Sequence, residues 1–98
     1  MKPNKQPDSR QQKANTKALA SALSGLTNPD EVHAFLIDIC TPAELQALAD
    51  RWQVAVLLER GLSYRAINER TGVSVTTIGR VARFMSQGAG GYTAALGN

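Results

Sequence analysis

The chain has 98 residues, of which 43% are hydrophobic and 19% charged, and its formal net charge is +3. This composition indicates one globular domain, with or without a tail, and excludes a fibrous or wholly disordered chain. A single cysteine and a single histidine exclude an internal disulfide and leave a structural zinc ion without a ligand set. Because no apolar run is long enough to cross a membrane and the polar N-terminus lacks the apolar core of a secretory signal, we expect a cytoplasmic protein.

The charges are distributed unevenly along the chain. Residues 1–17 carry five basic side chains against one acidic one, and residues 63–98 carry four against one. Residues 18–62 instead hold two basic and six acidic side chains. An acidic middle between two basic ends indicates an anionic partner for the ends and a packing role for the middle.

The first elements in chain order are a polar arm and two short helices. Residues 1–13 contain two prolines and show no periodicity, and they are predicted to be a disordered basic arm. A helix is expected from about Thr16 to Leu23, where a Ser-Gly pair ends it. The next helix begins after Asn28, a suitable cap ahead of Pro29. Its apolar residues recur at helical spacing; they are Val32, Phe35, Leu36 and Ile39.

A long helix is predicted from Thr41 to about Arg60. Thr41 is suited to cap it, Pro42 takes the first helical position, and Glu44 is placed to complete a capping box. Gly61 ends the helix. Apolar side chains cover most of its circumference, which is typical of a helix buried on several sides. In so short a chain this favours burial by a second copy; a central helix in a monomeric bundle is the alternative.

The segment at about 63–87 has the features of a helix-turn-helix. A short helix ends at Gly72, and glycine tolerates the positive φ that such a turn requires. Ser74 is placed to cap a second helix, whose inward positions are Ile78 and Val81. The many β-branched residues would favour a strand by propensity, but the spacing of the apolar residues favours a helix. After this segment the chain is too rich in glycine for a helix to be predicted.

The outward face of this second helix is suited to the major groove of DNA. Its side chains are small or carry methyl or hydroxyl groups, apart from one arginine; they belong to Val75, Thr76, Gly79 and Arg80. Further arginines are placed to hold phosphates or a guanine edge; they are Arg65, Arg70 and Arg83. We therefore expect double-stranded DNA as partner. The alternative is a helical protein-interaction module of the same fold without operator binding.

No spacing of Ser, His and Asp indicates a catalytic triad, and the chain has no phosphate-binding loop of the Walker type. We therefore expect a protein that is not an enzyme and that binds no metal.

One segment, TPAELQALADRWQVAVLLERGLSYRAINERTGVSVTTIGRV at 41–81, together with GAGGY at 88–92, resembles the Trp repressor family, and within it the small regulators of the YerC/YecD type. The likeness covers about residues 28–92. It implies an all-α helical bundle with a C-terminal helix-turn-helix, assembled as an intertwined homodimer and acting as a transcriptional repressor at the nucleoid. The helices at 75–86 of the two subunits would enter successive major grooves about 34 Å apart. The domain would then span 14–92, with 93–98 as a tail.

The resemblance also implies roles for single residues. Arg65 matches a base-contacting arginine, and Thr77 matches a position near the DNA backbone. Positions near the bases are matched by Val75, Thr76 and Gly79.

In the Trp repressor two arginines hold tryptophan, and the matching residues are Arg51 and Arg80, with Thr41 at a position that lines the same pocket. Val81 stands where the Trp repressor has glycine, and its branched side chain should fill space that the ligand needs. The family's glycine two residues before Arg51 is Ala49 here. We therefore expect no cofactor, and tryptophan or another small amino-acid-like effector is the alternative. Without a ligand, Arg51 is expected to pair with an acidic neighbour.

Overall fold

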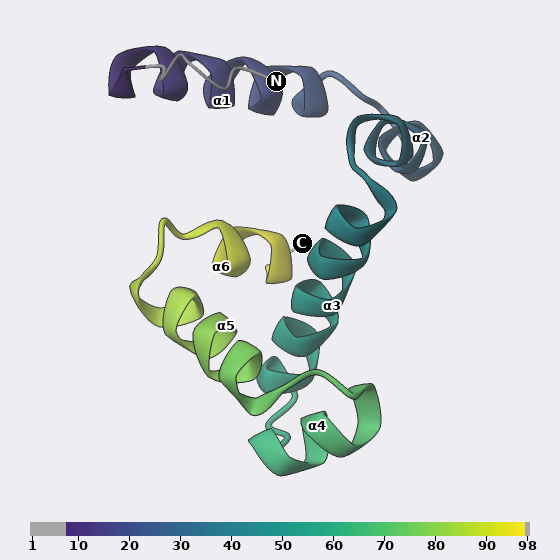
Figure 1. Ribbon diagram of the computed structural model, residues 1–98, viewed down its shortest axis with the longest axis vertical. Helices are drawn as coiled ribbons and strands as arrows, with labels where there is room; N and C mark the ends of the chain where they lie inside the picture. The colour runs from purple at the N-terminus through teal and green to yellow at the C-terminus, as the bar shows by residue number, and fades with distance from the viewer. Residues whose placement is uncertain (1–7, 98) are drawn as a thin grey trace. The chain divides into compact units, whose positions relative to one another are not determined.

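The computed structural model describes residues 8–97, which form helices joined by turns, with no strand in that range (Figure 1). The helices in chain order are α1 (Ser9–Ser24), α2 (Pro29–Ile39), α3 (Pro42–Glu59), α4 (Tyr64–Thr71), α5 (Val75–Gln87) and α6 (Gly91–Leu96). The chain divides into two compact units between Ile39 and Cys40, so that α1 and α2 belong to the first and α3 to α6 to the second. The predicted all-α fold with a helix-turn-helix is confirmed.

Helix α1 begins earlier than expected, at Ser9 rather than about Thr16. The carboxylate of Asp8 accepts a hydrogen bond from the backbone N–H of Gln11 at 2.7 Å, which caps the helix. The Gln, Lys and Ala residues that follow have high helix propensity. The predicted disordered arm at 1–13 is therefore wrong for its second part, and residues 1–7 lie outside the described residues.

Helix α2 begins as predicted, at Pro29, with Asn28 as its cap. The side-chain oxygen of Asn28 accepts a hydrogen bond from the N–H of Glu31 at 2.9 Å. Neither α1 nor α2 buries a single residue, although α2 carries the apolar spacing of a packing helix.

Helix α3 has the capping box predicted from the sequence. The Thr41 hydroxyl accepts from the N–H of Glu44 at 3.1 Å, and the Glu44 carboxylate accepts from the N–H of Thr41 at 2.8 Å. The helix ends at Glu59, and Gly61 turns the chain with a φ of 89°. Its buried residues, Val54, Ala55 and Leu57, all lie in the C-terminal half. The N-terminal half therefore carries no residue that is buried within the second unit.

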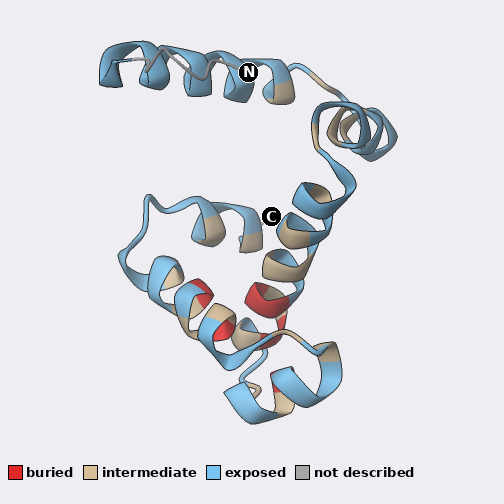
Figure 2. Cartoon of the chain, viewed as in Figure 1, coloured by how far each residue is buried: buried red, intermediate tan, exposed pale blue. Residues whose placement is uncertain are grey.

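The core of the second unit forms where α3, α4 and α5 meet (Figure 2). Its buried members are Val54, Ala55, Leu57, Ile67, Ile78 and Val81. Helix α4 ends at Gly72, which adopts a left-handed conformation with φ of 77°. Ser74 caps α5 by accepting a hydrogen bond from the N–H of Thr77 at 3.2 Å. The predicted turn, cap and inward face of the helix-turn-helix are all present.

Helix α6 corrects the prediction of an irregular C-terminus. It spans Gly91–Leu96, starts after Gly90 at a φ of 91°, and packs on α5. Tyr92 packs against the core, so the predicted boundary between a domain ending at 92 and a tail over 93–98 falls inside a helix. The glycines confine the bend to 88–90, after which the run from Thr93 to Leu96 can form a helical turn anchored by Tyr92.

Candidate nucleic-acid interface

One face of α5 is buried and the opposite face is open to solvent. Ile78 and Val81 are buried, while Val75 is 54% exposed. Thr76, Arg80 and Arg83 are also exposed, and Thr77 and Gly79 are half-buried. The structure thus leaves Val75 and Thr76 open to solvent at the start of α5 and partly covers Gly79; the contact of these residues with DNA stays a prediction.

Thr77 and Gly79 differ from the other predicted contact residues. The Thr77 hydroxyl accepts a hydrogen bond from the hydroxyl of Ser74 at 3.1 Å, so it is tied to the cap of α5. A Cβ at Gly79 would lie 3.8 Å from Cε2 of Tyr64, an ordinary contact. Packing within the chain therefore does not require glycine at 79.

The turn between α4 and α5 is held by side chains as well as by packing. Asn68 occupies a position where this motif commonly has a small residue, and its amide donates to the carbonyl of Val73 at 2.8 Å. The Thr71 hydroxyl donates to the carbonyl of Ile67 at 2.7 Å and accepts from the N–H of Val73 at 3.0 Å. These bonds fix the exposed side of α4 relative to the start of α5.

Arg65 projects from the exposed side of α4, and its side chain is 89% exposed. It forms an ion pair with Glu69, one helical turn later, with 3.5 Å between Nε and the carboxylate. Residues 63–87 carry four arginines against this one acid, and all four are exposed: Arg65, Arg70, Arg80 and Arg83. The helix-turn-helix is therefore a basic surface, as a nucleic-acid interface requires.

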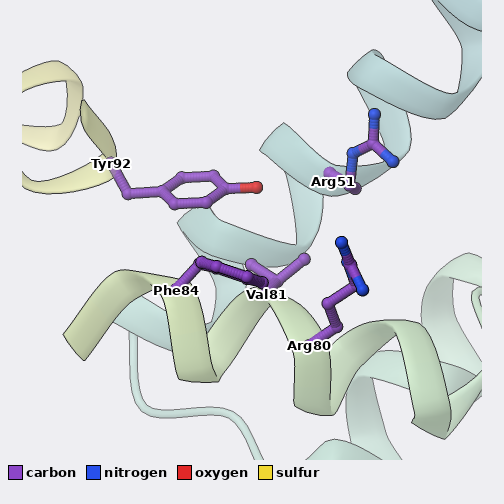
Figure 3. Close-up of a pocket in the computed structure, with 5 residues that line it drawn as sticks. All are labelled: Arg51, Arg80, Val81, Phe84 and Tyr92. Carbon is purple, nitrogen blue, oxygen red and sulfur yellow. The ribbon is translucent and has the colours of Figure 1, made fainter. Parts of the chain in front are cut away.

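A pocket of about 340 Å³ adjoins this surface, between α3, α5 and α6 (Figure 3). It is lined by Arg51, Arg80, Val81, Phe84 and Tyr92. Arg80 extends from α5 toward α3, where Arg51 lies, and the Tyr92 hydroxyl is directed toward α3 as well. The predicted convergence of Arg51 and Arg80 is therefore present.

Three further predictions concern this pocket. Thr41 caps α3 and is not among the residues that line the pocket in one chain, and its role at an effector stays a prediction. Val81 is 1% exposed and forms part of the wall, and its exclusion of a ligand stays a prediction. The expected acidic partner of Arg51 is absent, since the one ion pair among residues 8–97 joins Arg65 and Glu69.

Two lining residues were missed by the sequence analysis. Phe84 follows Arg80 by one helical turn, and its ring centroid lies 5.2 Å from the guanidinium carbon of Arg80, which is a cation–π contact. That spacing of four residues was a usable signal. Tyr92 gave no such signal, because its position depends on how α6 packs on α5.

Residues 8–97 contain no cluster of three His, Cys, Asp or Glu side chains that would hold a metal ion. None of the helices in that range combines the length and apolar character needed to span a bilayer.

Comparison with known proteins adds to this geometry. The family described as Trp repressor protein matches residues 14–98, which extends the likeness to most of α1 and to α6. The uncharacterized protein YerC of Bacillus subtilis (strain 168) is 38% identical over 78 residues, which cover 80% of this chain and 75% of YerC.

Two solved structures are similar as well. A candidate Trp repressor from Staphylococcus aureus has a TM-score of 0.77 and 37% identity, over 85% of this chain and 83% of that one. A TrpR-like protein from Eubacterium eligens ATCC 27750 has a TM-score of 0.76 and 35% identity, over 84% of each chain.

Proposed function

Because the chain belongs to the Trp repressor family, whose members are DNA-binding transcriptional regulators, we propose that it is a sequence-specific repressor that reads its operator through α5. The main support for the proposal is that α5 has one face buried in the core and another face exposed to solvent. Ile78 and Val81 hold the helix in the core, and Val75 and Thr76 are exposed on the surface of the second unit as described over residues 40–97. A helix anchored in this way presents its first turns to the major groove.

The chemistry of the exposed residues supports DNA as the partner. The methyl groups of Val75 and Thr76 are suited to the C5-methyl of thymine, and the Thr76 hydroxyl can donate to or accept from a base edge. Because Gly79 has no side chain, nothing projects from α5 at this position to hinder the close approach of a DNA strand. Arg80 and Arg83 supply charge for phosphates, which fix the register of the protein but do not read sequence.

We further propose that the repressor acts as a homodimer. The proposal is supported by apolar surface that each unit by itself leaves open: α1 and α2 bury no residue, and Trp52 on α3 is 41% exposed. Surfaces of this kind are normally buried by association. A two-fold dimer would set two copies of α5 one helical turn of DNA apart, so the operator should be a palindrome. The dimer would act in the cytoplasm, at the nucleoid.

We also propose that tryptophan is not required. The Phe84 ring already stacks near the Arg80 guanidinium, so an indole would compete with a side chain of the protein for the same cation. The proposal is supported by this aromatic contact and by the branched side chain of Val81 in the pocket wall. Arg80 is ordered from within the chain, and the DNA-reading face needs no ligand to complete it.

Selection of bound duplexes from a random DNA pool tests the proposed function. The full chain is incubated with the pool at one fixed salt concentration, with and without tryptophan, and the retained duplexes are sequenced. We expect one palindromic consensus with half-sites about 10 base pairs apart, unchanged by tryptophan. A pool that stays random would contradict the proposal and favour a helical protein-interaction module of the same fold.

A further inference from the structure

One ion pair lies on the exposed side of α4. The small amount by which it stabilises the fold does not explain why it is there. Arg65 and Glu69 lie 3.5 Å apart, and their side chains are 89% and 65% exposed. Ion pairs this exposed contribute little to folding, because water screens them and two side chains must be ordered. Glu69 is also the only acid between residues 63 and 87. A negative charge in the middle of a basic DNA-binding surface calls for another explanation.

The atoms that make the contact indicate how the pair can work. Glu69 approaches Arg65 at Nε, which belongs to the side edge of the guanidinium. The end edge, formed by Nη1 and Nη2, remains available as a pair of parallel donors. Such a pair matches the O6 and N7 acceptors of guanine in the major groove. An arginine paired through its side edge therefore keeps its end edge free to read a base.

The position of the pair relative to α5 is fixed. Asn68 precedes Glu69 on α4, and its amide donates to the carbonyl of Val73, just before α5 begins. Gly72 and Thr71 complete the same turn. The side of α4 that bears Arg65 and Glu69 is therefore held at the start of the recognition helix and does not vary independently of it.

We propose that Glu69 is a positioning residue that raises the sequence specificity of this DNA-binding surface. On the correct base pair, Arg65 binds guanine through its end edge while Glu69 keeps its side edge, so the carboxylate stays neutralised. On any other sequence Arg65 turns to a phosphate and leaves Glu69 unpaired beside the DNA backbone, where the two negative charges repel. Glu69 thus lowers the affinity for other DNA sequences more than it lowers the affinity for the operator. The inference rests on the proposed function, because it assigns a role within the same DNA interface.

The test compares Glu69→Gln with the wild type on two duplexes, the operator selected by the wild type and a shuffled sequence of equal composition. Glutamine keeps the size of the side chain and removes its charge. We expect affinity for the shuffled duplex to rise by about threefold or more and the ratio of operator to shuffled affinity to fall by at least as much. Glu59→Gln is the matched control: it makes the same charge change at an exposed position outside the helix-turn-helix, and it should leave the ratio unchanged.

The same comparison in an Arg65→Ala background separates positioning from general electrostatics. If Glu69 acts through Arg65, the loss of specificity caused by Glu69→Gln should disappear when Arg65 is absent. An unchanged ratio in the Glu69→Gln single variant, or an equal loss in both backgrounds, would overturn the inference. Failure of the proposed function looks different, because the wild type itself would then show no preference for any duplex.

Discussion

The guanidinium carbon of Arg80 lies 5.2 Å from the ring centroid of Phe84, one turn further along α5. Both side chains line the pocket that Arg51 approaches from α3. A cation–π contact at a partly exposed site contributes about 0.5–1 kcal/mol. This is enough to bias the position of an arginine that also lies on the basic surface of the helix-turn-helix. The pocket and the proposed DNA-reading face are therefore linked through one residue.

Tryptophan should not increase operator affinity. Phe84 already provides Arg80 with an aromatic partner, so an indole gains little by entering. Calorimetric titration of the wild type with tryptophan should show no saturable heat, and operator affinity should be the same with and without it. Saturable binding together with a rise in operator affinity would contradict the account of Phe84.

Arg65→Ala and Thr76→Ala should each lower the discrimination between operator and shuffled DNA without removing it. A side chain that reads a base edge contributes about 1–3 kcal/mol of discrimination. Both residues are exposed, so the fold and assembly should persist. Arg60→Ala serves as the control, since it removes an arginine that is also exposed but lies outside the helix-turn-helix. If both variants keep the operator preference of the wild type, the reading face has been assigned to the wrong residues.

Ile78→Ala should destabilise the protein strongly. Ile78 is fully buried at the junction of α3, α4 and α5, and truncating a buried isoleucine costs about 2–5 kcal/mol. The free energy of unfolding from urea titration at one protein concentration measures the effect. Val75→Ala changes a 54% exposed valine on the same helix and should alter stability by about 0.5 kcal/mol or less. Equal losses in the two variants would mean that α5 does not pack as described.

The proposed dimer can be separated from DNA binding by two substitutions. Trp52→Glu places a charge on the uncovered side of α3 and should shift sedimentation equilibrium from dimer toward monomer. Val75→Glu places the same charge at the start of α5 and should abolish operator binding through repulsion from phosphate, while the dimer remains. The dimer proposal would be contradicted by a wild type that sediments as a monomer, or by a Trp52→Glu variant that sediments as the wild type does.

The elements that could be predicted from the sequence are those defined by contacts between near neighbours. The capping box of Thr41 and Glu44 and the cap at Ser74 each join residues three apart. The turn at Gly72 depends on one backbone conformation that glycine favours. Ile78 and Val81 follow from the helical period alone. These local signals were sufficient to locate the helix-turn-helix and its outward face.

The elements that were missed depend on weaker or longer-range terms. Asp8 begins α1 by capping a segment whose polar composition suggested disorder. Helix α6 is short and glycine-flanked, and its contacts with α5 and the packing of Tyr92 on the core support it. The two arginines of the pocket were named from the family resemblance. Phe84 and Tyr92 were not, because they line the pocket only through the packing of three helices. Thr41 caps α3, and its proposed place at an effector site stays a prediction.

The ratio of affinities for the selected operator and for a shuffled duplex, measured by fluorescence anisotropy at one fixed salt concentration, tests the central claim most directly. A repressor that reads bases through α5 should prefer its operator by about a thousandfold or more. The preference should fall in Thr76→Ala and should persist without tryptophan. A ratio near one, with equal affinity for every duplex, would show that the basic surface binds phosphates alone and would contradict the account.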